Sequence, residues 1–118
     1  MTDPDVLIEL RDRLRCFAAD RDWDQFHSPK NLAMALSVEV AELLEHFQWL
    51  SEDASRDLPP DRLQKVGEEA ADVLVYLIRL ADKLGIDLAG AARAKITANA
   101  VKYPIEKARG SIRKYTEL

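Results

Sequence analysis

The chain has 118 residues, of which 47% are hydrophobic and 32% charged, and its net charge is −4. This composition is typical of a single globular domain over residues 1–118 and argues against an intrinsically disordered chain. The negative charge argues against general binding to a nucleic-acid polymer or an acidic membrane, since both require a basic surface. One cysteine, no leader and no apolar run of about 20 residues predict a cytoplasmic protein without a membrane span.

Apolar residues recur at helical spacing through the chain, and the alternation typical of strands is absent. The first predicted helix begins after a cap at residues 2–4, where a proline can occupy the first helical position, and it ends near Arg21. Residues 20–31 form a connection rich in turn-forming residues. A second helix is predicted over residues 31–50.

The second half of the chain contains two more predicted helices. Residues 51–60 form a polar loop that ends in two prolines, and a third helix follows and extends to about Leu84. Gly85 ends this helix, and Asp87 can cap a fourth helix that reaches about Lys102.

The third helix carries the segment VLVYLI over residues 73–78, which is apolar on nearly every side. Such a helix must be covered on every side, and a four-helix monomer of this size has too few helices to do so. We therefore predict an all-α, four-helix bundle that is completed by oligomerisation, as a homodimer or a homotetramer.

Four acidic residues border the apolar stripes of the second and third helices. Glu39 and Glu42 are three residues apart, and Glu69 and Asp72 repeat this spacing. Residues three apart are neighbours on a helix surface, so packing of the two stripes would bring the four carboxylates together. Like charges crowded in this way oppose folding unless a cation lies between them.

A single Glu-x-x-Glu pair is common on solvated helix surfaces and by itself indicates nothing more. Two matched pairs, each beside an apolar stripe, favour a metal site. Oxygen ligands without cysteine suit Mg²⁺, with Mn²⁺ as a possible substitute, better than zinc or a soft metal.

Five segments occur in an order that resembles the MazG-like superfamily of all-α nucleoside triphosphate pyrophosphohydrolases, and within it the dCTP pyrophosphatase branch. The segments are RDWDQFHSPKNL, EVAELLEHFQW, EEAADVLVYL, the pair Lys95 and Asn99 before KYP, and the terminal RKYTEL. The resemblance implies hydrolysis of a deoxynucleoside triphosphate, such as dCTP or a modified dCTP, to the monophosphate and pyrophosphate, in nucleotide-pool sanitation. It also implies a helical dimer or dimer of dimers.

The resemblance assigns Mg²⁺ binding to Glu39, Glu42, Glu69 and Asp72. One of these, or Glu45 or Glu68, is expected to orient or deprotonate the attacking water. One departure concerns the base: Leu14 stands where some close relatives carry a histidine on the first helix.

The resemblance also places Trp23, Trp49 and Tyr76 in the base and sugar pocket, and Lys95 and Asn99 near the phosphates and sugar. Indole rings stack on nucleobases for about 1–3 kcal/mol per base. On the predicted second helix, Trp49 would lie close to Glu42 and the metal flank. The alternative is that these aromatic rings only hold the connection against the bundle.

Two further sets of polar residues have a binding and a structural interpretation. Lys95, Asn99 and Lys102 share one helix face and are suited to phosphate binding, but lysine is also favoured near a helix C-terminus. His27 can either hydrogen-bond the base edge or cap the connection.

Two other kinds of helical protein also carry clustered acidic residues. A di-iron or di-manganese carboxylate oxidase needs Glu-x-x-His pairs. That pattern fails here, because His46 is four residues from Glu42 and His27 is in a connection. A non-catalytic helical interaction module would use the acids as a docking surface and would bind no metal.

Overall fold

The computed structural model describes residues 5–118, so the cap predicted at residues 2–4 lies outside the described residues. Within residues 5–118 the secondary structure is helical and contains no strand, which confirms the all-α fold class. In this range no helix is both long and apolar enough to cross a bilayer. The chain forms two compact units, Met1–Ile86 and Asp87–Leu118, and the prediction of a single domain stays a prediction.

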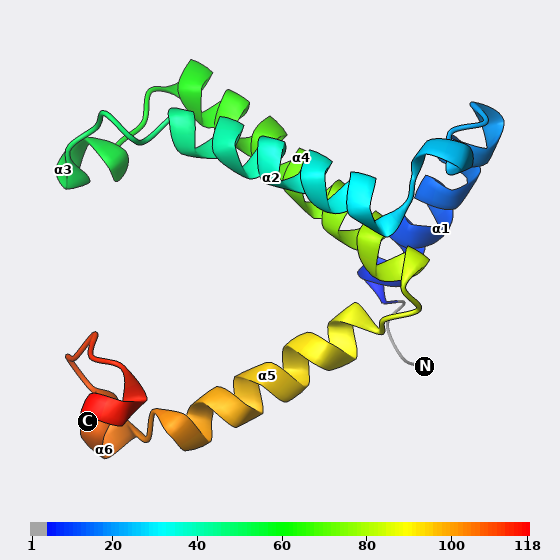
Figure 1. Ribbon diagram of the computed structural model, residues 1–118. Coiled ribbons are helices and arrows are strands. Elements are labelled where there is room, and N and C mark those ends of the chain that lie inside the picture. The colour runs from blue at the N-terminus through cyan, green and yellow to red at the C-terminus, as the bar shows by residue number, and fades with distance from the viewer. Residues whose placement is uncertain (1–4) are drawn as a thin grey trace. The chain divides into compact units, whose positions relative to one another are not determined.

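The first unit is built on two long helices, α2 (Pro29–Glu45) and α4 (Pro60–Lys83), which lie side by side (Figure 1). Helix α1 also packs on α4. In chain order the unit contains α1 (Val6–Asp20), η1 (Asp24–Phe26), α2 (Pro29–Glu45), α3 (Glu52–Ser55) and α4 (Pro60–Lys83).

Helices α1 and α2 begin at capping side chains. The Asp5 carboxylate accepts a hydrogen bond from the amide of Leu7 at 2.9 Å. The Ser28 hydroxyl accepts one from the amide of Asn31 at 3.1 Å, and Pro29 occupies the first position of α2. These contacts satisfy amides that a helix start leaves unpaired.

The hydrophobic core of the described residues is small. Four apolar side chains are buried: Ala18, Leu32, Ile78 and Ala81. Many large apolar side chains on α2 and α4 stay exposed, including Met34, Val38, Leu44 and Leu74. The apolar faces of these helices are therefore only partly covered within this unit.

The end of α2 and the segment that follows it differ from the sequence prediction. Helix α2 ends at Glu45 and not at Leu50, because the amides of Phe47 and Gln48 both donate to the carbonyl of Leu44 and turn the chain. The predicted loop at 51–60 contains the one-turn helix α3, which the Ser51 hydroxyl caps by accepting from the amide of Ala54.

Gly85 ends α4 with a φ of 66°, the left-handed conformation that glycine adopts without strain. The second unit contains α5 (Leu88–Lys102), α6 (Ile105–Ala108) and η2 (Tyr115–Glu117). Asp87 caps α5 as predicted, since its carboxylate accepts from the amide of Gly90 at 3.1 Å. Tyr103 and Tyr115 pack edge to face with ring centroids 6.0 Å apart.

Candidate metal centre

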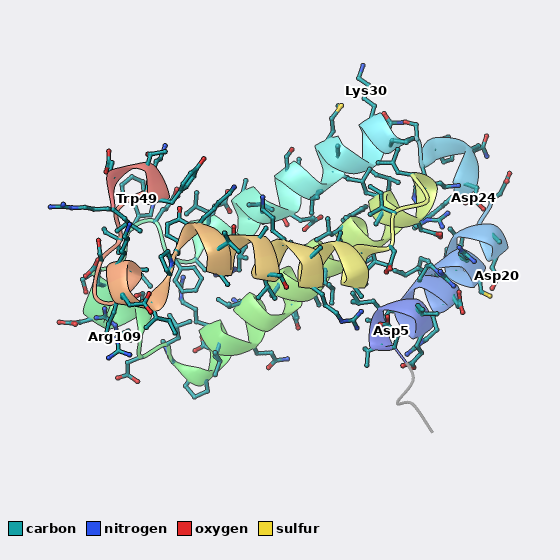
Figure 2. The ribbon with its side chains drawn as sticks, turned by 90° about the horizontal axis from the view of Figure 1, so that it is seen from below. Asp5, Asp20, Asp24, Lys30, Trp49 and Arg109 are labelled. Carbon is teal, nitrogen blue, oxygen red and sulfur yellow. The ribbon has the colours of Figure 1, made fainter. Side chains whose placement is uncertain are left out.

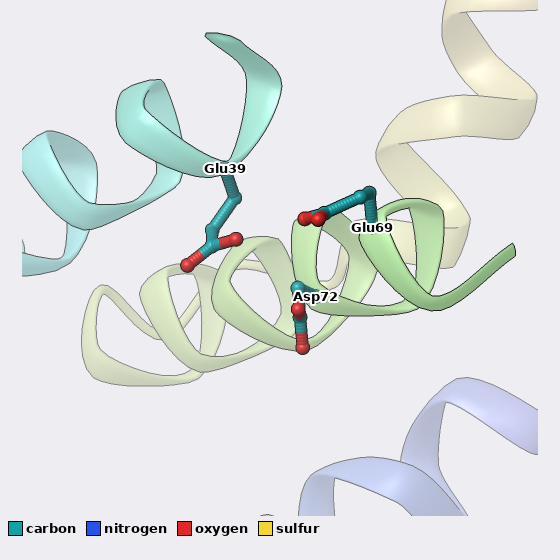
Figure 3. A group of neighbouring side chains, drawn as sticks. All are labelled: Glu39, Glu69 and Asp72. Atoms are coloured by element: carbon teal, nitrogen blue, oxygen red, sulfur yellow. The ribbon is translucent and has the colours of Figure 1, made fainter. Parts of the chain in front are cut away.

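Three carboxylates meet where α2 faces α4. Glu39 comes from α2. Glu69 and Asp72 come from α4, where they are three residues apart and so lie on one face of the helix (Figure 3). One oxygen from each residue lies within 4.8 Å of the others. This is the convergence that the matched spacing predicts, because the two helices pack along their apolar stripes.

Glu42 interacts with two members of this cluster. Burial, followed by the interaction with the Glu42 side chain, raises the pKa of Glu39 above its ordinary value of 4.5. The same two causes, in the same order, raise the pKa of Glu69. All four acidic residues singled out from the sequence therefore share one electrostatic environment, and their role as ligands stays a prediction.

Two oxygens of the cluster lack a hydrogen-bond partner. Oε2 of Glu39 and Oε2 of Glu69 are both buried, and no group among residues 5–118 donates to either. An unpaired buried carboxylate oxygen is costly, since it has lost water without gaining a donor. A divalent cation would supply the missing partner, and an all-oxygen set is the kind that Mg²⁺ and Mn²⁺ prefer.

The predicted aromatic residues of the connection lie together. The ring centroids of Phe17 and Trp23 are 5.7 Å apart, and those of Trp23 and His27 are 6.3 Å apart, both edge to face. Trp23 keeps 44% of its surface exposed. The group is thus anchored on α1 and still presents an indole to solvent.

Trp49 is not on a helix, which corrects its predicted position beside Glu42. Lys30 lies at one end of α2 and Trp49 beyond the other (Figure 2), after the turn that ends the helix. Its side chain is 88% exposed. Tyr76 is half-buried on α4, one turn after Asp72.

The basic residues predicted to bind phosphate belong to the second unit. Lys95, Asn99 and Lys102 lie on successive turns of α5, as expected. The ammonium group of Lys102 lies 5.0 Å from the centroid of the Tyr115 ring, a cation–π contact that gives this lysine a structural role within the unit.

One buried arginine is not predicted from the sequence pattern. Arg79 on α4 is 5% exposed, and it contacts Asp24, His27 and Asp82. The available signal was a lone arginine inside the apolar run VLVYLIRLA, because a charge in such a run must find partners when the run is buried.

The chain matches known proteins over most of its length. Residues 34–118 match the MazG-like family. The chain is 45% identical to dCTP pyrophosphatase 1 of Mus musculus over 98% of its own length and 69% of that protein, and 45% identical to dCTP pyrophosphatase 1 of Homo sapiens over the same shares.

A solved structure is also similar. The crystal structure of a pyrophosphatase from Archaeoglobus fulgidus superposes with a TM-score of 0.80 at 44% identity, covering 88% of this chain and 97% of that one. The resemblance read from the five sequence segments is thereby confirmed. The chain belongs to the MazG-like family, and it is an enzyme of the nucleotide pyrophosphohydrolase class.

Proposed function

We propose that the chain hydrolyses dCTP or a modified dCTP to the monophosphate and pyrophosphate, with Mg²⁺ held by Glu39, Glu42, Glu69 and Asp72, and so removes such nucleotides from the cellular pool. The observation that carries the proposal is the pair of buried, unpartnered carboxylate oxygens inside the acidic cluster. The dCTP pyrophosphatases at 45% identity support the choice of substrate.

The acidic residues have two tasks in this proposal. A triphosphate would be repelled by the cluster alone. Glu39, Glu42, Glu69 and Asp72 would hold Mg²⁺, and the ion would supply the positive charge that offsets this repulsion, polarises a phosphoryl oxygen and lowers the pKa of a water. A carboxylate that is not needed as a ligand would orient or deprotonate the water, and Glu45 and Glu68 are further candidates. Lys95, Asn99 and Lys102 are proposed to contact the phosphates and the sugar, and Tyr76 to cover the sugar.

A substrate screen tests the proposal. The purified protein with Mg²⁺ is given all canonical and several modified dNTPs and NTPs, and pyrophosphate is resolved from orthophosphate. We expect pyrophosphate as the product, with dCTP or a modified dCTP as the preferred substrate. Release of orthophosphate, or no turnover of any cytosine nucleotide, would contradict it.

Magnesium is expected to raise the melting temperature of the protein. A ligand at about a hundred times its dissociation constant stabilises the folded state by about 2.7 kcal/mol if it binds only that state. For a chain of this size the shift is roughly 10 °C. Differential scanning fluorimetry in EDTA and in millimolar MgCl₂, with ionic strength matched by NaCl, measures it. An unchanged melting temperature in MgCl₂ would count against the metal site.

Replacing Trp49 with alanine is expected to raise KM roughly tenfold and to change kcat little, because a stacking interaction with the base contributes to substrate binding. The side chain is 88% exposed, so its loss should cost little stability. Steady-state kinetics on dCTP measures both constants. Trp49→Phe keeps an aromatic face and should recover most of the affinity; an unchanged KM in Trp49→Ala would rule out stacking.

A further inference from the structure

Arg79 is the one charged side chain that is buried among residues 5–118. Its guanidinium contacts a different partner on each side. One terminal nitrogen donates to the carboxylate of Asp24, which lies in the connection between α1 and α2 (Figure 2). The other lies 3.5 Å from Oδ2 of Asp82, and Nε donates to Nδ1 of His27 at 3.1 Å.

The bond from Arg79 determines which nitrogen of His27 carries the proton. A guanidinium keeps its proton at any physiological pH and can only donate. Nδ1 of His27 is therefore an acceptor, and a neutral ring with this acceptor has its proton on Nε2. Burial, and next the positive charge of Arg79, lower the pKa of His27, which keeps the ring neutral at pH 7.

The other charged groups around His27 do not make its imidazole charged. Asp24 would favour a charged imidazole, but it is shared between Arg79 and the ammonium group of Lys83, which lies 3.0 Å away. Asp82 is engaged by Arg15, whose Nε donates to Oδ2 at 2.8 Å. The network thus contains three cations and two carboxylates, and this excess of positive charge does not favour a charged imidazole.

Nε2 of His27 is left with a hydrogen to donate. None of the hydrogen bonds within residues 5–118 engages this nitrogen, and it lies on the side of the ring away from Nδ1 and Arg79. The ring packs edge to face against Trp23, whose indole is 44% exposed. A single N–H donor therefore lies beside an accessible aromatic face, the combination that binds a flat ring bearing a carbonyl oxygen.

We propose that Arg79 is a positioning residue for substrate binding: it holds His27 neutral and oriented, so that Nε2–H donates to a carbonyl oxygen of a pyrimidine base stacked at Trp23. This inference rests on the proposed function, because it assigns a nucleotide to the site. Arg79 itself does not touch the substrate.

The state of His27 is tested on the unmodified protein. The chain has two histidines, so ¹⁵N-histidine labelling and a long-range ¹H–¹⁵N spectrum at pH 7.5 resolve both, and His46→Gln assigns them. We expect the Nδ1 of His27 to resonate as an unprotonated nitrogen and Nε2 as a protonated one. An Nδ1–H tautomer or a charged ring would overturn the proposal, whether or not the protein turns over dCTP.

The effect on binding is tested by kinetics with dCTP. Arg79→Met should raise KM about three- to tenfold, the loss of one well-oriented hydrogen bond, with kcat within about twofold. Arg15→Met is the matched control: it removes another arginine of the same network without touching His27, and its KM should not change. Equal changes of KM in the two variants would show a structural role only.

A third variant covers the case in which Arg79→Met does not fold. His27→Gln should raise KM to a similar degree, and an unchanged KM would overturn the proposal. If wild type hydrolyses no nucleotide, the proposed function fails, and the spectrum of His27 still decides whether Arg79 sets its tautomer.

Discussion

Replacing Glu39 with glutamine is expected to lower turnover by at least roughly a hundredfold and, in the absence of metal, to make the protein more stable. The loss of activity follows from the proposed role of Glu39 as a ligand of Mg²⁺, since a bound metal would supply charge stabilisation in the transition state. The gain in stability follows because Oε2 of Glu39 is buried without a partner beside other carboxylates. Pyrophosphate release and urea unfolding in EDTA measure the two effects.

The gain in stability of metal-free Glu39→Gln over wild type should depend on pH. The folded-state pKa of Glu39 is raised above 4.5, so the folded protein retains a proton that the unfolded chain releases. The free energy of unfolding of the metal-free protein therefore falls as the pH rises above 4.5. Glu39→Gln removes part of that pH dependence. The variant's free energy of unfolding should therefore exceed that of wild type by more at pH 8 than at pH 5.

The control for this experiment is Glu52→Gln, which changes an exposed glutamate of α3 outside the cluster. It should leave turnover and the pH dependence of unfolding close to wild type. Retained turnover in Glu39→Gln, or a variant less stable than wild type at pH 8 in EDTA, would mean that the cluster does not hold a cation.

Replacing Leu74 with glutamate is expected to convert the predicted oligomer to a monomer. Leu74 is 38% exposed in the single chain, and it belongs to the apolar run that the sequence predicts to pair between subunits. An apolar groove of about 680 Å³, lined by Leu10, Leu14, Phe17 and Val75 among others, adds to the uncovered surface. Burying an unpaired carboxylate in an interface costs several kcal/mol, roughly a thousandfold in association.

Light scattering coupled to size exclusion measures the change, with 13.3 kDa expected for the monomer. Lys65→Glu is the matched control, because it lies on the opposite face of α4 by helical geometry and reverses a charge there. It should stay oligomeric. A wild-type protein that is already a monomer would refute the predicted oligomer, as would a Leu74→Glu variant of unchanged mass.

The long helices and the acidic cluster could be predicted because both depend on local spacing. Asp87 caps α5 and Gly85 ends α4 where expected, since capping depends on a few neighbouring residues. The meeting of Glu39 with Glu69 and Asp72 follows from two helices burying matched stripes. Periodicity alone therefore predicted the fold class and the residues that converge.

The remaining errors concern features set by tertiary contacts or by turns. The apolar spacing of residues 46–50 predicts a helix that continues to Leu50, whereas the amides of Phe47 and Gln48 both donate to the carbonyl of Leu44 and turn the chain away. The contacts of Arg79 with Asp24 and His27 join residues more than 50 positions apart, and helical spacing contains no information on such pairs.

The buried guanidinium of Arg79 also couples folding of the connection before α2 to folding of the rest of the first unit. Arg79 can leave water only when Asp24 and His27 are in place, so the segment around Trp23 and the end of α4 must assemble together. Local opening of that segment would leave the Arg79 guanidinium buried without Asp24 and His27 as partners. We therefore expect the segment to behave as part of the global foldon, although it is a surface connection by position.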